Sequence, residues 1–432
     1  MFYSTFNLQS LWPVATLLTI AVIIPIILDI FKLKFIPSLA VEIIVGLGLG
    51  FIPDTREFFL DESGELSSIN EGIYVLGMSI LLFLSGLDTN FGVFKKTKKG
   101  ENMVINELVL SIICFAFVLL LSFGASFIFY DYIPGRKMLG ITLLTIFFSS
   151  TFASLVIPLV HDYDIEHTTI GRIVSTYSTI AELFSILALS ILIALETNGN
   201  KWWLILVVFG LLALIIIIKR FIPIEKIFND KLEGITHLST RVTILGLLLF
   251  VILSDLAGAE YILGAFLLGM VFSLLGTSKN LVSKVNSIGY GIFVPMFYML
   301  AGYKVALTIN EIGYSDFFTL SNLGLFALIF AIMLLVKMPF MVLAKYYPIK
   351  TYLPSIFIIT STIIVALSIE HISGEYDIFT HNLVACLVFA SLITCVIPPI
   401  LFANNKDFGE AREKYKPVIL EKSDVMNLQH HD

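Results

Sequence analysis

The chain has 432 residues, of which 57% are hydrophobic and only 14% are charged, and its mean hydropathy is +0.94. This composition excludes an ordinary soluble protein and is typical of one that crosses a membrane many times. The formal net charge of -6 gives no support to nucleic-acid binding. The three cysteines, Cys114, Cys386 and Cys395, lie in apolar runs without zinc-site spacing, so we expect small core residues and no cofactor.

Apolar runs of roughly 17 to 25 residues, bounded by polar turns, predict an all-α membrane protein with about 13 transmembrane helices. The first run has no basic segment before it and no small-residue cleavage site, so we expect a retained span and not a signal peptide. The transmembrane domain covers residues 1–404, and residues 405–432 form a short cytoplasmic tail. The predicted spans lie near 12–30, 36–52, 73–91, 104–130, 138–161, 169–195, 202–219, 238–256, 260–276, 286–307, 321–346, 352–372 and 379–404.

Lysine and arginine are concentrated in alternate loops of this topology. With the N-terminus outside, the inside loops hold the clusters at 95–99, 219–241 and 279–284, and the tail holds five more basic residues. The outside loops hold Arg56, Arg136, Lys137, Lys201 and Lys304. The positive-inside rule therefore places the N-terminus outside and the C-terminus in the cytoplasm of a cell membrane.

Small and polar residues recur in the same order about 210 to 220 positions later, as internal repeats do. FLSGL at 83–87 corresponds to MLAGY at 299–303, and SST at 149–151 corresponds to TST at 360–362. Gly46, Gly48 and Gly50 likewise correspond to Gly264 and Gly269. A single linker span near 202–219 separates the two halves, so the second half would enter the membrane in the opposite orientation. We therefore predict two inverted six-helix repeats, about 12–195 and 238–404. The alternative is that small and apolar residues match by chance.

One carboxylate, Glu182, lies near the middle of the predicted sixth span. No basic side chain lies within a helical turn of it, and burial favours the protonated form of a carboxylate. Protons and metal ions would then compete for this group, which is the chemistry of an ion/proton exchanger. The alternative is a protonated glutamate that only hydrogen-bonds a neighbouring helix. Glu42 lies near the end of its span, where we expect an interfacial or structural role.

The fifth and twelfth spans are rich in hydroxyl groups at mid-depth, at Ser149, Ser150, Thr151, Thr360, Ser361 and Thr362. Serine and threonine satisfy backbone groups where a membrane helix breaks, and broken helices direct their ends at ion sites. We favour two broken crossing helices over simple hydrogen bonding between helices.

Lys337 in the eleventh span has no acidic residue within a turn. It is a candidate counter-charge to Glu182 or to a broken helix end. The alternative is a lysine that extends its ammonium group toward the cytoplasmic surface.

Six segments, in order, resemble the bacterial monovalent cation:proton antiporters, which include Na+/H+ exchangers and Kef-type K+/H+ systems. They are IPSLAVEIIVGLGLG, LLFLSGLDTNF, FFSSTFASLVIPLV, GRIVSTYSTIAELF, YILGAFLLGMVFS and GYGIFVPMFYMLAGYKVAL. The resemblance implies that Glu182 binds the transported Na+ or K+ and the proton, that Thr151 lies near the ion, and that Lys337 is the family's membrane-embedded base. It also implies a core domain that moves against a scaffold domain, with the scaffold forming a homodimer.

Two features depart from the family pattern. The residue before Glu182, usually Asp, Asn or Gln, is Ala181, and no regulatory nucleotide-binding domain follows residue 404.

From the intramembrane carboxylate and the family resemblance, we predict a secondary antiporter that exchanges Na+ or K+ for H+ in cation and pH homeostasis, not an enzyme. The ion and proton site comprises Glu182, Thr151 and Ser150, and the crossing-helix polar groups are Ser149, Ser361 and Thr362. The alternatives are a K+ efflux pathway and a transport-inactive membrane sensor.

Overall fold

The computed structural model describes residues 11–32, 38–61, 64–87, 107–162, 169–197, 210, 237–256, 261–276, 279–313, 317–340 and 363–403. Their regular structure is helical apart from one isolated bridge between Leu60 and Leu66. Seven helices in these ranges are long and apolar enough to cross a membrane, and shorter apolar helices accompany them. The chain is an all-α membrane protein, as its composition predicts.

The helices overlap the predicted spans where the structure describes them, with bounds that differ by several residues at the predicted spans near 73–91, 286–307 and 352–372. Apart from Gly210, the predicted span near 202–219 lies outside the described residues, and so does the tail at 405–432. In the first half the helices are α1 (Trp12–Ile30), α2 (Ser38–Phe51), α3 (Arg56–Phe59), α4 (Ser68–Leu87), α5 (Glu107–Ser126), α6 (Lys137–Ser149), α7 (Ala153–Asp162) and α8 (Thr169–Thr197). In the second half they are α11 (Leu238–Leu256), α12 (Tyr261–Leu275), α13 (Lys279–Ile288), α14 (Val294–Ile312), α16 (Leu320–Val336), α18 (Ile363–Tyr376) and α19 (His381–Ala403).

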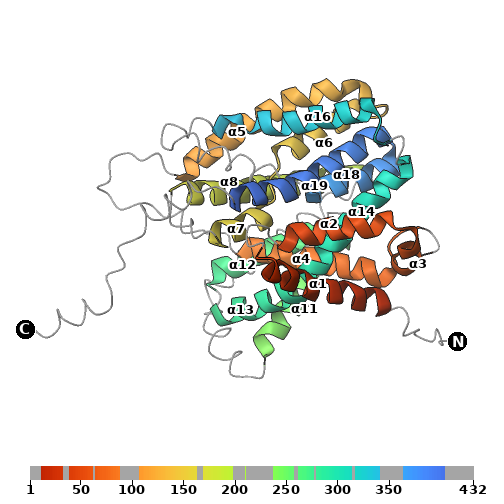
Figure 1. The fold of residues 1–432 in the computed structure, drawn as a ribbon. Coiled ribbons are helices and arrows are strands. Elements are labelled where there is room, and N and C mark those ends of the chain that lie inside the picture. The colour runs from red at the N-terminus through yellow and green to blue at the C-terminus, as the bar shows by residue number, and fades with distance from the viewer. Residues whose placement is uncertain are drawn as a thin grey trace, which may run out of the picture.

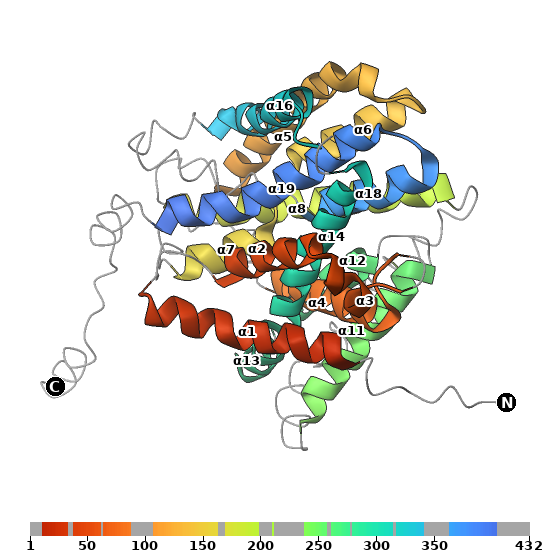
Figure 2. The ribbon, with the colours of Figure 1, turned by 45° about the vertical axis from the view of Figure 1, so that its right-hand side comes forward.

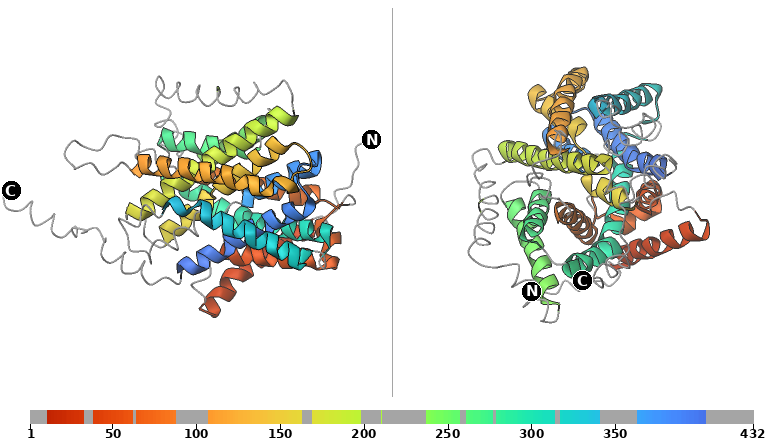
Figure 3. Two further views of the ribbon diagram at one scale, coloured as in Figure 1. Left: turned by 90° about the horizontal axis from the view of Figure 1, so that it is seen from above. Right: turned by 90° about the vertical axis from the view of Figure 1, so that its left-hand side faces the viewer.

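The helices pack as two neighbouring groups, each with members from both halves of the chain (Figure 1, Figure 2). The α8 group comprises α5, α6, α7, α8, α16, α18 and α19, and the α14 group comprises α1, α2, α4, α11, α12, α13 and α14. Figure 3 shows many of these helices side by side and, in the second view, several nearly end on. The groups meet where α19 packs against α2 and α14, and where α4 packs against α7.

Glycines let pairs of helices in the α14 group pack so closely that their backbones touch. A Cβ on Gly46 of α2 would collide with the backbone of Met299 on α14, and one on Gly302 would collide with the backbone of Ile43. In the second pair, a Cβ on Gly269 of α12 would collide with the backbone of Phe83 on α4. Small residues at such crossings are a main source of helix association in membranes. Gly46 and Gly269, which were noted in the sequence, therefore act in packing, whereas a Cβ on Gly48 would meet no atom within 4 Å.

The predicted fifth span is broken, as its hydroxyl groups indicated. Helix α6 ends at Ser149, Ser150 is extended with φ -68° and ψ 160°, and α7 begins at Ala153. The hydroxyl of Ser150 donates to Phe147 O at 2.8 Å, which satisfies one of the carbonyls freed at the helix end. The break thus places a helix C-terminus and a helix N-terminus within the protein interior.

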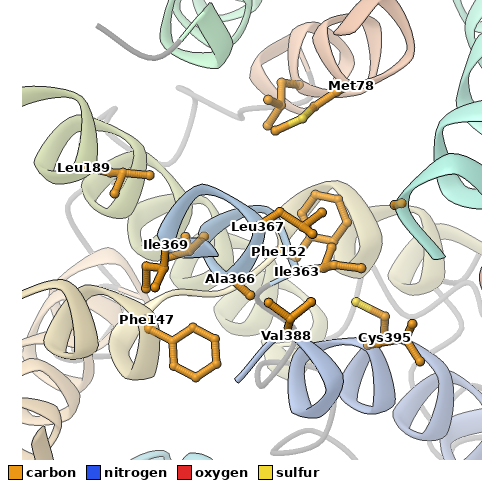
Figure 4. Packing of buried hydrophobic residues seen from close by; sticks show 14 of the residues in the cluster. Met78, Phe147, Phe152, Leu189, Ile363, Ala366, Leu367, Ile369, Val388 and Cys395 are labelled. Carbon is orange, nitrogen blue, oxygen red and sulfur yellow. The ribbon is translucent and has the colours of Figure 1, made fainter. Parts of the chain in front are cut away.

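Helix α18 covers this break. In Figure 4 its side chains Ile363, Ala366 and Ile369 lie among residues of other helices, including Phe147 of α6 and Leu189 of α8. All five side chains are buried. The break is therefore enclosed by apolar packing, which keeps lipid and bulk water away from its polar groups.

Candidate functional site

Glu182 is held in the interior of the molecule by α8. Its side chain is 3% exposed, and the preceding Ala181 is fully buried. The hydroxyl of Ser85, on α4, donates to Glu182 Oε2 at 2.9 Å. Because α4 belongs to the α14 group and α8 to the other, this hydrogen bond crosses the boundary between the two groups.

A small cavity lies beside this carboxylate at the break between α6 and α7. Its free space is about enough for one water molecule. Glu182, Thr151 and Ser150 were predicted from the sequence to form one site, and the structure brings them together around this space. The cavity is lined by Ser150, Thr151, Phe152, Glu182, Ser185, Ile186 and Val365.

Lys337 follows the last residue of α16, and its side chain reaches the C-terminal end of α6. Its Nζ donates to Ser150 O at 2.7 Å, to Ser149 O at 3.1 Å and to Thr151 Oγ1 at 3.3 Å. The last carbonyls of a helix carry a partial negative charge, so an ammonium group there is favourable. With 1% exposure, the side chain does not extend to the surface, and the snorkelling alternative does not describe this structure.

The crossing-helix hydroxyl residues have different positions. Ser149 presents its backbone carbonyl to Lys337, while its hydroxyl donates to Ile146 O at 3.2 Å. Ser361 and Thr362 lie outside the described residues, as does Thr360. Among Ser149, Ser150 and Thr151, the last two line the cavity.

The local sequence did not predict Ser85, Ser178 or Tyr177 as neighbours of the site. Ser85 is the serine of the repeated FLSGL segment. Its hydroxyl in the middle of an apolar span was the one signal in the sequence that could have indicated a role near the site. Ser178 lies one helical turn before Glu182, and its buried hydroxyl has no hydrogen-bond partner in the described part of the chain. Tyr177 places its ring 5.7 Å from Lys337 Nζ. None of these contacts follows from local sequence, because each depends on how α8 faces its neighbours.

The oxygen groups beside the cavity suit a weakly held monovalent ion better than a resident divalent metal. The described residues hold no group of three or more His, Cys, Asp or Glu side chains that could bind a metal ion. One carboxylate and several neutral hydroxyl groups offer hard oxygen ligands with a single negative charge. Such a set can hold either one proton or one monovalent cation.

The family model described as "Sodium/hydrogen exchanger, transmembrane" matches residues 18–403. The Bacillus subtilis (strain 168) protein named "Putative Na(+)/H(+) antiporter YjbQ" is 28% identical over 97% of this chain and 67% of its own length. "Probable Na(+)/H(+) antiporter 3" of Methanocaldococcus jannaschii is 24% identical over 89% of this chain and 94% of its own length. "Cation/H(+) antiporter 19" of Arabidopsis thaliana is 23% identical over 63% of this chain and 35% of its own length. The enclosed carboxylate site and the family match together lead to one conclusion: the chain belongs to the transmembrane sodium/hydrogen exchanger family, whose members are cation/proton antiporters.

Proposed function

We propose that the chain exchanges Na+ or K+ for H+ across the cell membrane, with Glu182 as the group that carries both. The observation that supports this most strongly is the buried Glu182 carboxylate at a cavity lined by Ser150 and Thr151. A carboxylate enclosed in this way is stable when it binds a proton or a compensating cation, but costly when it is bare. The two ligands therefore exclude each other, and their competition couples cation movement to proton movement.

The cation would replace the proton on Glu182 and take further oxygen ligands from Ser150 and Thr151. The hydroxyl of Ser85, which donates to Glu182 Oε2, stabilises the charged carboxylate while a cation is bound. Lys337 holds the end of α6 in place through its bonds to Ser149 O and Ser150 O. The site is then assembled from α4, α6, α8 and α16, which belong to two groups of helices.

Alternating access would follow from movement of the α8 group as a core against the α14 group as a scaffold. Support comes from the bond between Ser85 and Glu182, which joins the two groups at the site itself. A displacement of α8 relative to α4 would break this bond and change which side of the membrane reaches Glu182. The scaffold also forms the homodimer in this proposal. Exposed apolar side chains of α1 (Val22, Ile26, Ile27 and Ile30) provide a face for lipid or a second copy.

The two halves of the chain would form inverted repeats. The glycine contacts support this, because Gly46 faces Met299 whereas Gly269 faces Phe83. Phe83 begins FLSGL and Met299 begins MLAGY, so each repeat contributes one glycine helix and one partner helix to an equivalent contact. The same exchange relates Gly86, which faces Phe266, to Gly302, which faces Ile43.

The experiment that tests the exchange is a cation-induced pH change in proteoliposomes that contain the purified protein. A pH-sensitive dye is enclosed, a cation is added outside, and the series covers Na+, K+, Li+ and Rb+. We expect proton efflux with Na+ or K+ and none with choline at the same ionic strength. A folded protein that gives no signal with any of the four cations would contradict the proposal and favour the sensor alternative. A cation flux without coupled proton movement would favour the K+ efflux pathway.

A further inference from the structure

A hydrogen bond between Thr308 and Glu370 joins the two groups of helices, and the proposed exchange mechanism does not use it. The hydroxyl of Thr308, on α14, donates to Glu370 Oε1, on α18, at 3.3 Å. These helices belong to different groups and lie next to each other in Figure 1 and Figure 2. The bond therefore crosses the same boundary as the bond between Ser85 and Glu182, but at another place.

The bond lies between the cavity and one end of the molecule. Val365 of α18 lines the cavity, and Glu370 follows five residues later, about 7.5 Å further along the helix. Helix α14 ends at Ile312 and α18 ends at Tyr376, so the pair is close to the ends of both helices. The distribution of lysine and arginine predicts that these two ends face the outside.

The helices are closely packed around the pair. Thr308 is 4% exposed, and the neighbouring side chains Val305, Ile309 and Ile369 are completely buried. The boundary between α14 and α18 is thus closed at this depth. Access from the outside to the cavity along this boundary requires the two helices to separate, which breaks the bond between Thr308 and Glu370.

The hydroxyl of Thr308 has a second acceptor on its own helix. Its Oγ1 lies 3.1 Å from Lys304 O, one turn earlier in α14. A hydroxyl has one proton to donate, so the two acceptors compete for it. When α18 moves away, Thr308 can donate fully to Lys304 O, and Glu370 meets the water that enters. Breaking the bond therefore leaves no buried polar group unpaired, and the bond can form and break in each cycle.

The turn of α14 that carries Thr308 is also attached to α4. Lys304 Nζ pairs with Glu71 Oε2 at 3.1 Å and lies 4.3 Å from the centre of the Tyr74 ring. Both partners are on α4, which belongs to the same group as α14. Thr308 is therefore held on the scaffold side of the boundary, and Glu370 is the partner that moves.

We propose that Thr308 and Glu370 form an outer latch, which keeps the outer side of the ion pathway closed and opens when the α8 group moves. The inference rests on the alternating access of the proposed function. It assigns a conformational role to Glu370, whereas Glu182 carries the cation and the proton. Loss of the latch should shift the protein toward the form that is open to the outside.

The test measures access from the outside and not transport. The three cysteines are replaced by alanine, and Val365→Cys then places one thiol at the cavity. A membrane-impermeant maleimide is added to intact cells, and the rate of labelling is followed. We expect Thr308→Val to raise this rate about tenfold, which corresponds to about 1.4 kcal/mol in favour of the outward-open form. Thr308→Ser keeps the hydroxyl and should be labelled at the rate of the parent protein.

Glu370→Gln tests the other side of the same bond. Its amide oxygen is an uncharged and weaker acceptor, so labelling should also become faster, by a smaller factor. The double variant should be labelled no faster than Thr308→Val alone, because both changes act on one interaction. Thr243→Val in α11 is the matched control, since it removes an equally buried hydroxyl that donates along its own helix, to Ser239 O at 2.9 Å. It should leave the labelling rate unchanged.

Three results would overturn the outer latch. They are an unchanged rate in both Thr308→Val and Glu370→Gln, multiplied effects in the double variant, and an equal rise in Thr243→Val, which would indicate generally loosened packing. Labelling does not depend on ion flux, so the two proposals can fail separately. Faster labelling in a protein without cation/proton exchange would contradict the proposed function alone. Exchange with unchanged labelling would contradict the latch alone.

Discussion

At the contacts of α2 with α14 and of α4 with α12, glycines let two helix backbones touch, whereas hydroxyl groups and a lysine fill the break between α6 and α7. At Gly46, Gly302, Gly86 and Gly269 the glycine contacts are to backbone atoms, and their stability comes from close packing. The break is polar, and its hydrogen bonds satisfy carbonyls that are freed where α6 ends. A membrane protein of this kind therefore separates a closely packed part from a part that holds charge, and the two should respond differently to substitution.

The largest expected effect is on transport, in the polar region. Glu182→Gln keeps the size of the side chain and its contact with Ser85, but the amide can neither release a proton nor compensate a cation. We expect cation/proton exchange and cation self-exchange to be abolished, while the melting temperature in detergent stays close to that of the wild type. Asp54→Asn, a change to an exposed carboxylate, is the control and should leave transport unaltered. Wild-type rates in a well-folded Glu182→Gln protein would remove this residue from the site.

In the glycine-packed region, substitution should affect stability first. Gly46→Leu forces α2 away from Met299, and overpacking of this kind costs about 1–3 kcal/mol or more. The matched control is Gly48→Leu in the same helix, because a Cβ at Gly48 meets no atom within 4 Å. Thermal unfolding in detergent measures both. A similar loss of stability in the two variants would mean that helix propensity or side-chain size, and not the α2 to α14 contact, accounts for the change.

Lys337→Met tests whether the polar region also contributes to stability. The variant keeps an unbranched side chain but removes the ammonium group that donates to Ser149 O and Ser150 O. These two buried carbonyls would then lose their hydrogen bonds from Lys337. We expect a loss of about 1–3 kcal/mol in thermal unfolding, the usual cost of an unsatisfied buried polar group. Lys304→Met is the comparison, because Lys304 is 27% exposed in its pair with Glu71 and should contribute about 1 kcal/mol or less. Equal effects from the two lysines would contradict the assigned role of Lys337.

A smaller effect is expected for the hydroxyl beside the cavity. Thr151→Val keeps the shape of the side chain and removes one oxygen ligand of the proposed cation. One hydrogen bond or ligand contact is worth about 1 kcal/mol, so the apparent affinity for the cation should fall about fivefold. Thr142→Val in α6 is the control, since within the described part of the chain its hydroxyl bonds only to the preceding turn, at Met138 O. If the two variants have the same affinity as the wild type, Thr151 is a helix-packing residue.

The last prediction is that membrane potential has no effect on exchange. With Ala181 in the position before Glu182, one carboxylate carries one proton or one monovalent cation, so each cycle is electroneutral. Lys337 keeps its proton in this scheme because carbonyls at the end of α6 surround it. Burial alone would favour the neutral amine, so a second proton from Lys337 is the competing scheme. Rates that change with an imposed potential in the wild type, and not in Lys337→Gln, would establish two protons per cation.

The local sequence was sufficient for many of the described helices and for the presence of an acid, Glu182, within an apolar span. Helices α1 and α11 have the bounds of their predicted spans, because length and hydropathy of a run decide whether it crosses a bilayer. Glu182, Thr151 and Ser150 were predicted as site residues because a polar group in an apolar span is conspicuous in the sequence. The break at Ser150 was likewise indicated by three consecutive hydroxyl residues.

Only the tertiary structure decided which groups meet. Ser85 and Glu182 are 97 positions apart, and Lys337 and Ser150 are 187 apart, so nothing in either segment specifies its partner. The sequence left Lys337 with two possible counter-charges, and packing of α16 beside α6 placed it at the helix end. Glu42 was assigned to the edge of a span because its depth depends on how α2 packs against α14 and α19. Hydropathy is a property of each segment alone, whereas burial and pairing are properties of the assembled helices.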